Sequence, residues 1–340
     1  MTTPSISVNM PCYNVEGTVD EAVASILGQT WPDFELIAVD DGSDDGTAAR
    51  LEAWAERDPR VRVLHREHTG LVASLNAGLE LCLGTLVARH DADDVALPER
   101  LQAQAALLHS DESLAAVGTL VEGFPAEHVR EGFRQYLEWQ NQLVSPEAIA
   151  RQIFVESPLA HPSIMFRRAW LEKLNGYQDL GWPEDYDLLL RMHLAGAKFG
   201  KVPRLLVRWR EHAQRLTRVD PRYSLEAFLR AKAHYLRRGP LAGEPRVVVW
   251  GAGHMGRRLS KHLVREGVDL AAFIDIDPAK IGREKRGRPI YDPERLPELV
   301  RVLSPVVVLA AVGARGARAL IRARLMEMGL VEGMDWWAVA

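Results

Sequence analysis

Acidic side chains follow two of the apolar runs in the first half of the chain. Asp41 comes directly after one run, and Asp91, Asp93 and Asp94 follow another. Because ligands of a parallel sheet bind outside the carboxyl ends of its strands, we expect these carboxylates to meet at one rim. Two carboxylates at positions i and i+2 repel each other unless a cation lies between them. Asp91 and Asp93 therefore predict a site for Mn²⁺ or Mg²⁺, which bind carboxylates together with substrate phosphates.

Ordinary turn chemistry is the alternative explanation for acidic clusters, because aspartate and glycine are common in turns. We favour that alternative for Asp44 and Asp45, which stand beside Gly46. A second acidic group, Glu184 with Asp185, stands at the start of a predicted helix. Acids complement the dipole at a helix N-terminus, but this does not explain the Trp-Pro pair that precedes them.

The elements that must position these acids alternate between strand and helix. Strands are expected at residues 6–10, 34–39, 61–65 and 85–89, and helices at residues 19–27, 47–56, 71–82 and 98–109. This alternation predicts an α/β fold with a parallel sheet and right-handed crossovers. From about residue 124 to residue 238 the alternation ends and helical patterns dominate.

A second, smaller α/β unit is expected after a linker at residues 239–245, which contains two prolines and two glycines. In it, a strand at residues 246–250 leads into Gly251, Gly253 and Gly256 and then a helix. Further strands are expected at residues 270–274 and 306–312, and a helix at residues 314–328. Asp275, at the end of the second strand, has the spacing of a ribose-binding acid.

This pattern predicts a Rossmann-like domain over residues 246–340. With about 95 residues, the domain is too short for a full dinucleotide fold, and it has no Tyr-x-x-x-Lys pair for sugar epimerase chemistry. A bound nucleotide and a docking module with a vestigial glycine loop both stay open.

Composition and charge exclude several classes of protein. The net charge of −4 over 340 residues gives no basic field for nucleic acid. Two cysteines are too few for a disulfide framework, and no apolar run approaches the roughly 20 residues of a membrane-spanning helix. The N-terminus lacks the features of a signal peptide, so we expect a cytoplasmic protein. Peripheral membrane contact and a homo-oligomer stay open.

Four segments of the first half form an ordered series: residues 7–14, 26–30, 35–47, and 90–94 with 97–101. Each motif alone is a weak signal, but their order is specific. Together they resemble the family-2 glycosyltransferases with the GT-A fold. The resemblance spans roughly residues 5–220, within an expected domain over residues 1–238.

The resemblance implies roles at the acidic rim. Asp41 would accept a hydrogen bond from the nucleobase, and Pro11 and Tyr13 would line the pocket for the base and the ribose. Asp91 would contact the nucleotide or the edge of the metal, and Asp93 would be the direct metal ligand. We expect Asp94 to lie outside the coordination shell.

Residues 181–191 resemble the Glu-Asp motif of inverting members of that family, in which the aspartate is the general base. Asp185 is therefore the expected base, and Glu184 its neighbour near the acceptor or the diphosphate. An inverting transfer is a single displacement that needs one base and one metal. A retaining glycosidase would instead need a close pair of carboxylates and no metal.

Three further residues follow from the same resemblance. His161 and Arg210 would contact the acceptor or the diphosphate, and a turn-capping role is as strong an explanation for His161. His212 is expected either as a third metal ligand or as a lone surface histidine. The Gln-x-x-Arg-Trp signature of processive synthases is absent, because position 205 is leucine.

The resemblance thus implies a metal-dependent inverting glycosyltransferase and, by analogy with the family, a role in bacterial polysaccharide or glycoconjugate synthesis. We expect its donor to be a nucleotide-diphosphate sugar, and the rim chemistry is the same for UDP-, GDP- and dTDP-sugars. We expect its acceptor to be a glycan, a lipid-linked glycan or another hydroxyl. A catalytically silent nucleotide-sugar-binding protein is one alternative. An NAD-dependent sugar-modifying enzyme that uses the C-terminal domain is the other.

Overall fold

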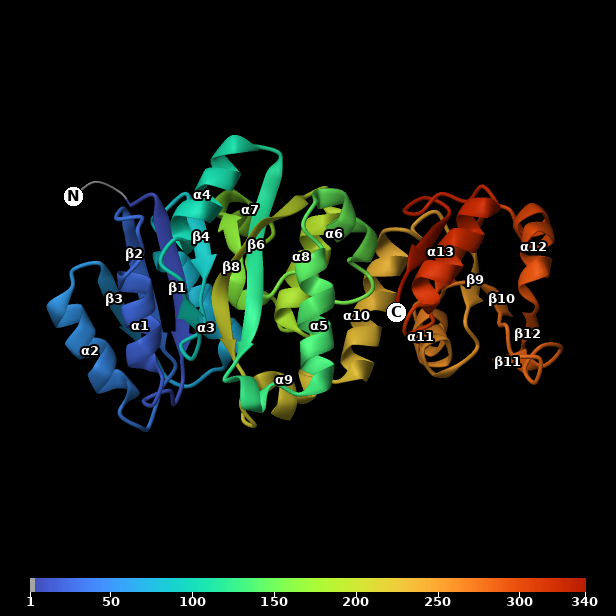
Figure 1. Cartoon of the computed structure of the whole chain (residues 1–340). Coiled ribbons are helices and arrows are strands. Elements are labelled where there is room, and N and C mark those ends of the chain that lie inside the picture. Colours follow the sequence, from blue (N-terminus) through green and yellow to red (C-terminus); the bar gives the residue numbers. More distant parts are fainter. Residues whose placement is uncertain (1–3) are drawn as a thin grey trace. The chain divides into compact units, whose positions relative to one another are not determined.

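The computed structural model describes residues 4–340, and these divide into two compact units. Figure 1 labels the elements of both. The first unit comprises residues 4–150, Ser157–Leu180 and Glu184–Val219; the second comprises Arg151–Glu156, Gly181–Pro183 and Asp220–Ala340. No helix of the described residues is long and apolar enough to cross a bilayer.

The first unit is built on a mixed sheet of eight strands in the order β3-β2-β1-β4-β7-β6-β8-β5. The strands β3, β2, β1 and β4 are parallel, as the alternating pattern predicts, whereas β7 runs antiparallel to both of its neighbours. The strands are β1 (Ile6–Cys12), β2 (Phe34–Asp40), β3 (Val61–His65), β4 (Leu86–Arg89), β5 (Val95–Ala96), β6 (Leu114–Phe124), β7 (Met165–Arg167) and β8 (Lys198–Arg210).

Helices follow the strands as crossovers in the N-terminal half and join irregular segments after it. The helices up to residue 219 are α1 (Val19–Leu27), α2 (Thr47–Arg57), α3 (Leu71–Leu81), α4 (Arg100–Ser110), α5 (Glu131–Gln142), α6 (Pro146–Gln152), α7 (Arg168–Lys173), α8 (Glu184–Leu194) and α9 (Leu216–Val219).

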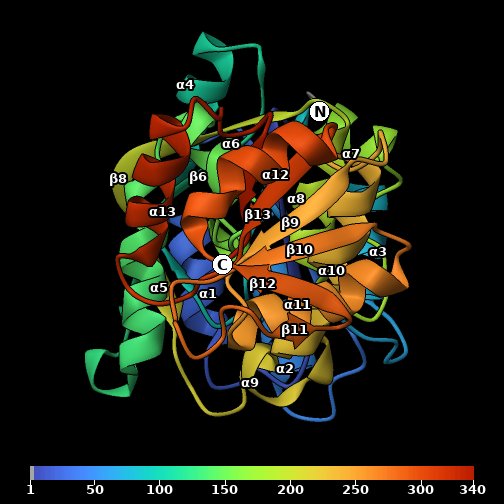
Figure 2. The same cartoon turned by 90° about the vertical axis from the view of Figure 1, so that its right-hand side faces the viewer.

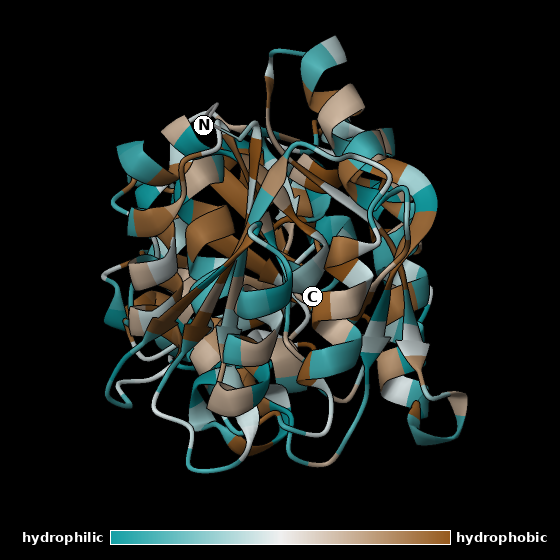
Figure 3. Cartoon of the chain, turned by 90° about the vertical axis from the view of Figure 1, so that its left-hand side faces the viewer, coloured by the Kyte–Doolittle hydropathy of each residue, from teal (hydrophilic) through white to brown (hydrophobic). Residues whose placement is uncertain are grey.

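Alternation of side chains along β1 explains how helices pack on both faces of the sheet. Val8 and Met10 belong to the same buried apolar cluster as Val23 of α1, where Figure 3 shows brown strands. On the other face, the amide of Asn9 donates to the carbonyl of Leu75 in α3, with a nitrogen–oxygen distance of 2.9 Å. A Cβ on Gly78 of α3 would lie 2.1 Å from Asn9 Oδ1, so this close approach requires glycine.

The strand β8 departs from the sequence expectation, because it lies in the stretch where helical patterns dominate. Its thirteen residues mix buried apolar side chains with exposed charged ones, and Pro203 interrupts them. Its pairing with β6 is irregular on either side of Leu120, whose partner is Leu205. A proline cannot donate to the ladder, and a bulge accommodates it. The charges and the proline hide the period-two signal of this strand.

The second unit holds a six-stranded sheet in the order β11-β12-β10-β9-β13-β14, parallel except for β11. Figure 2 shows β13, β9, β10 and β12 side by side. The strands are β9 (Arg246–Trp250), β10 (Leu270–Ile274), β11 (Glu284–Lys285), β12 (Arg288–Tyr291), β13 (Val306–Ala310) and β14 (Trp336–Ala338), and the helices are α10 (Leu225–Arg238), α11 (His254–Arg265), α12 (Leu296–Leu303) and α13 (Ala317–Glu327).

Helix α10 belongs to this second unit although it precedes the linker expected at residues 239–245. Its Glu226 accepts from Arg258 at 2.6 Å and lies 2.7 Å from Nε2 of His262, both in α11. These contacts lower the pKa of Glu226 to about 2, with the hydrogen bond from Arg258 as the largest cause. The ion pairs thus tie α10 to the Rossmann-like sheet through its first crossover helix.

Candidate active site

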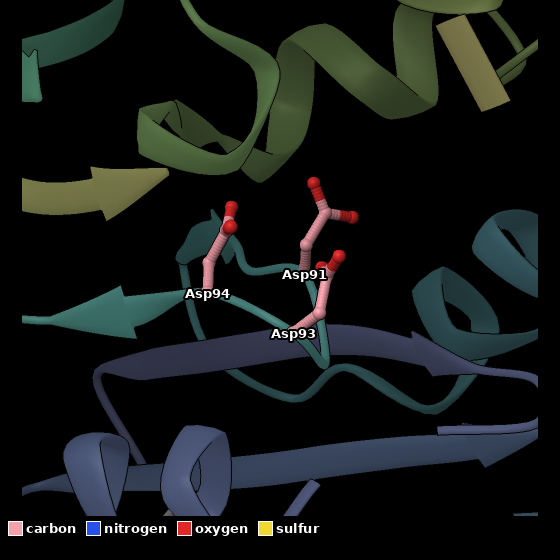
Figure 4. Close-up of side chains that lie close together, drawn as sticks. All are labelled: Asp91, Asp93 and Asp94. Atoms are coloured by element: carbon pink, nitrogen blue, oxygen red, sulfur yellow. The ribbon is translucent and has the colours of Figure 1, made fainter. Parts of the chain in front are cut away.

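The loop after β4 brings three carboxylates together. One carboxylate oxygen from each of Asp91, Asp93 and Asp94 lies within 4.8 Å of the other two, so these side chains form a group that could hold a metal ion. Figure 4 shows the three carboxylates on the same side of the loop. Asp94, which sequence reasoning set apart from the metal, is therefore part of the cluster. It is also its most buried member, with 1% of its surface exposed.

A different partner fixes each carboxylate. The buried guanidinium of Arg89 pairs with Asp91. The backbone N–H of Arg210 donates to Asp94 Oδ1 at 2.7 Å, and His212 Nε2 lies 2.9 Å from Asp93 Oδ2. Within residues 4–340, Asp94 Oδ2 is buried without a hydrogen-bond partner.

The electrostatics of the cluster favour an added cation. Burial, with the neighbouring charges of Asp93 and Asp91, raises the pKa of Asp94 well above its ordinary value. Burial also raises the pKa of Asp91, although Arg89 opposes the rise. A hard divalent cation prefers oxygen ligands, and it would satisfy Asp94 Oδ2 while offsetting the repulsion. The donor set therefore fits Mg²⁺ or Mn²⁺.

Asp41 and Tyr13 lie on the same rim, after β2 and β1. The backbone N–H groups of Gly70 and Thr69 donate to the Asp41 carboxylate at 2.8 and 3.2 Å. Burial alone would raise the pKa of Asp41, but hydrogen bonds from Ser74, Gly70 and Thr69 together lower it. Asp41 is therefore an ionised acceptor that also holds the loop before α3.

Pro11 and Tyr13 stand at the end of β1. Pro11 is opposite Val39 in the register of β1 and β2 and is partly buried. Tyr13 is 45% exposed, and its ring stacks on the imidazole of His68. Sequence reasoning did not find His68, because nothing in its local pattern indicates that it reaches Tyr13.

The second acidic group opens α8. Glu184 is buried, and its Oε1 lies 3.9 Å from Nδ1 of His161. The other ring nitrogen of His161 lies 2.9 Å from the hydroxyl of Tyr177. Asp185 is partly exposed, and its Oδ1 accepts from the backbone N–H of Tyr186 at 2.7 Å. Of the two acids, Asp185 is the one with access to solvent.

Arg89 links the two acidic groups electrostatically. Burial lowers its pKa, but attraction to Asp91, Tyr177 and Glu184 raises it above the ordinary value overall. Sequence reasoning missed this residue, although a cation that ends a buried strand directly before aspartates is a usable signal. One buried cation, Arg89, is thus attracted both to the carboxylates after β4 and to the start of α8.

Arg210 is the last residue of β8, His212 follows it, and both contact the loop that carries the carboxylates. The Arg210 Nε donates to the backbone carbonyl of Asp93 at 2.6 Å, and its guanidinium also pairs with Glu21. The hydrogen bond to Asp93 raises the pKa of His212, while burial opposes the rise. Both side chains therefore hold the loop that carries the carboxylates.

The glycines of the loop in the second unit differ in their surroundings. A Cβ on Gly256 would lie 1.8 Å from the carbonyl oxygen of Gly251, whereas a Cβ on Gly253 would meet nothing within 4 Å. Asp275 Oδ2 accepts from the backbone N–H of Ala252 at 2.8 Å, and Lys280 Nζ is 3.3 Å from the same oxygen. Asp275 therefore already supports the loop and pairs with a lysine.

Comparison with known proteins identifies both units. Residues 7–174 match the model of glycosyl transferase family 2, and residues 243–327 match that of the CoA binding domain. Among solved structures, S. aureus TarS 1-349 in complex with UDP-GlcNAc aligns with a TM-score of 0.58 at 20% identity, over 77% of this chain and 72% of that one. This likeness shows the fold.

Relatives that are similar in sequence carry the name of glycosyltransferase as well. The putative glycosyltransferase EpsE of Bacillus subtilis is 32% identical over 66% of this chain and 79% of its own length. The O-antigen biosynthesis glycosyltransferase WbnJ of Escherichia coli is 33% identical over 55% of this chain and 71% of its own length. The chain therefore belongs to glycosyl transferase family 2 and is a glycosyltransferase with the GT-A fold.

Proposed function

We propose that this glycosyltransferase inverts the anomeric centre, moving a sugar from a nucleotide-diphosphate sugar to an acceptor hydroxyl in one metal-assisted displacement. The observation that carries the proposal is the group of Asp91, Asp93 and Asp94, whose ligand oxygens lie within 4.8 Å of one another. Asp94 also has a buried oxygen, Oδ2, that is without a hydrogen-bond partner in the described chain. This is the chemistry of a divalent cation site rather than of a surface turn.

The three aspartates would hold Mn²⁺ or Mg²⁺, with His212 joining Asp93 as a further ligand. When bound, the cation supplies positive charge against the diphosphate leaving group. Arg89 pairs with Asp91 and opposes the rise of its pKa, and Arg210 holds the backbone of Asp93, so the protein itself preorganises the ligands.

Asp185 would take the proton of the acceptor hydroxyl. A general base must reach its substrate, and Asp185 is partly exposed, whereas Glu184 is buried beside His161. His161 and Glu184 would then position the start of α8 near the acceptor. A single base is what separates this reaction from that of a retaining enzyme with two close carboxylates.

Asp41, Pro11 and Tyr13 would bind the nucleotide. The lowered pKa of Asp41 keeps its carboxylate ionised as an acceptor for a base N–H, and the exposed Tyr13 ring offers a stacking face. The name of the O-antigen biosynthesis relative WbnJ supports a role in bacterial polysaccharide or glycoconjugate synthesis.

The C-terminal unit would bind a nucleotide-type ligand at its glycine loop. The open space at Gly253 and the match to the CoA binding domain support this. Asp275 is engaged by Ala252 and Lys280, which disfavours the free ribose diol of NAD as its partner.

Transfer and binding assays on paired variants test the proposal. Nucleotide diphosphates that bind in the presence of Mn²⁺ identify the donor series, and release of nucleotide diphosphate from the matching sugar nucleotide reports turnover. We expect Asp185→Asn to abolish turnover with binding intact, and Asp93→Asn to weaken metal-dependent binding. Glu112→Gln, an exposed acid on the loop before β6, is the matched control. Full turnover by both site variants would refute the mechanism.

A further inference from the structure

The side chain of His68 covers the part of the rim where we place the nucleobase. Its imidazole stacks on the Tyr13 ring, with ring centroids 4.0 Å apart and planes 23° from parallel. Its Nδ1 lies 3.0 Å from the backbone carbonyl oxygen of Asp41 and 2.9 Å from Asp41 Oδ2. A flat ring with one face on an aromatic side chain and a ring nitrogen against acceptors makes the contacts expected of a base.

The backbone beside His68 is anchored more firmly than its side chain. Thr69 and Gly70 donate their N–H groups to the Asp41 carboxylate, which is 4% exposed. The His68 side chain is 52% exposed, so solvent is open to it when it leaves Tyr13. Rotation of an exposed side chain between staggered rotamers is fast and needs no movement of the loop. The imidazole can therefore leave the rim while the loop stays in place.

Asp41 retains other donors when His68 leaves. Gly70 N–H lies 2.8 Å from Oδ2, and Thr69 N–H lies 3.2 Å from Oδ1. Arg66 Nε lies 3.6 Å from Oδ1, and the buried Nη1 of Arg66 is without a hydrogen-bond partner in the described chain. When His68 leaves, the Asp41 carboxylate can accept a hydrogen bond from a ring N–H. The adjacent Arg66 guanidinium can donate to a neighbouring carbonyl. Uracil, thymine and guanine each present a ring N–H next to a carbonyl.

We propose that His68 is a built-in occupant of the nucleobase site, which the base of the donor nucleotide must displace from Tyr13 and Asp41. This inference rests on the proposed function, because it assumes that the rim binds a nucleotide. The imidazole keeps the aromatic face and the acceptors of Asp41 satisfied in the free enzyme. It lowers the apparent affinity for the nucleotide by the fraction of molecules in which the rim is open.

Calorimetric titration of the full chain with UDP, dTDP and GDP in the presence of Mn²⁺ tests the inference. For the nucleotide that binds wild type most tightly, we expect His68→Ala to bind about three- to tenfold more tightly, since removing the competitor leaves the site open. His109→Ala changes an exposed histidine at the end of α4 and should leave the dissociation constant unchanged.

A second measurement on the wild-type protein follows the imidazole directly. Stacking on Tyr13 places the His68 ring protons in the ring current of the tyrosine, and the His68→Ala spectrum assigns their signal. Saturation with the nucleotide should move this signal toward the position of an unstacked histidine. An unmoved signal at saturation would overturn the inference.

The outcomes separate the inference from the function on which it rests. If wild type binds a nucleotide and His68→Ala binds it equally or less tightly, His68 is no competitor, and the proposed function still stands. If neither protein binds any of the three nucleotides, the proposed function fails and the inference fails with it. Tighter binding by the variant, with the control unchanged, supports both.

Discussion

Replacing Asp94 with asparagine should stabilise the metal-free protein while weakening its metal site. Asp94 is 1% exposed, and its Oδ2 has no hydrogen-bond partner within the described residues. Burial and the charges of Asp93 and Asp91 raise the folded-state pKa of Asp94 well above its unfolded value. Because the folded protein holds this proton more tightly than the unfolded chain, the proton adds to the free energy of unfolding at low pH. That contribution is lost as the pH rises through the folded-state pKa of Asp94.

The carboxamide of asparagine keeps the acceptor oxygen that Asp94 uses and replaces the oxygen that has no hydrogen-bond partner. Its oxygen still accepts from the N–H of Arg210, at the 2.7 Å that Asp94 Oδ1 shows, and its NH₂ group donates toward the neighbouring carboxylates. Relief of an unsatisfied buried polar group is worth about 1–3 kcal/mol. For a domain of this size, each kcal/mol shifts Tm by roughly 2–4 °C. We therefore expect Tm at pH 8 in EDTA to rise by on the order of 5 °C.

Thermal unfolding of wild type and Asp94→Asn between pH 5 and 8, in EDTA and in Mn²⁺, measures both effects. The advantage of the variant should grow with pH in EDTA. Saturating Mn²⁺ at about 100 times its dissociation constant stabilises wild type by roughly 2.7 kcal/mol, and the variant by less. Glu112→Gln serves as the surface control. A lower Tm for Asp94→Asn at pH 8 in EDTA, or equal stabilisation of both proteins by Mn²⁺, would refute the reasoning.

Three further outcomes are expected from the same geometry. Removing the buried cation in Arg89→Met leaves Asp91 unpaired and should cost about 3–5 kcal/mol in chemical denaturation; a loss under 1 kcal/mol would contradict the pairing. Because Asp93 raises the pKa of His212, the protonated imidazole should compete with the cation. Mn²⁺ affinity should therefore fall as the pH drops through the pKa of His212, and it should fall less steeply in His212→Gln. Identical pH profiles of the two proteins would contradict a role for His212 as a ligand. Gly256→Ala should destabilise the second unit, because its Cβ would meet Gly251 O at 1.8 Å, while Gly253→Ala should be tolerated; equal melting curves would refute the loop geometry.

The parallel part of the fold could be predicted because its signals are local. The buried strands β1, β2 and β4 are short apolar runs, and each crossover helix carries its own apolar stripe. The long strand β8 could not, since its apolar positions are interleaved with charges and with Pro203. What makes it a strand is its pairing with β6, which is remote in sequence.

The residues of the site also differ in whether their signals are local in the sequence. Asp91 and Asp93 stand out by type and spacing, and the structure brings them together as the sequence predicts. Asp94 looks like a turn residue until its burial is known, and only the fold shows that its second oxygen lacks a partner. His68 is invisible for a similar reason, because its partner Tyr13 is distant in the chain and only the fold places the two rings together. Arg89 carries a usable signal, since it ends a buried strand directly before the aspartates, but its attraction to Glu184 depends on the fold.

Charge balance explains how so acidic a loop can fold before any cation binds. The guanidinium of Arg89 pairs with Asp91, and that of buried Arg100 is attracted to Asp94 and Asp91. Burial lowers the pKa of Arg100 to about 9, which remains high enough for the positive charge at neutral pH. These two fixed cations offset part of the charge of the three carboxylates, and the raised pKa of Asp94 offsets more, because it favours the protonated carboxyl when no cation is bound. A bound divalent cation would replace that proton, so metal binding and the stability of this loop should be coupled.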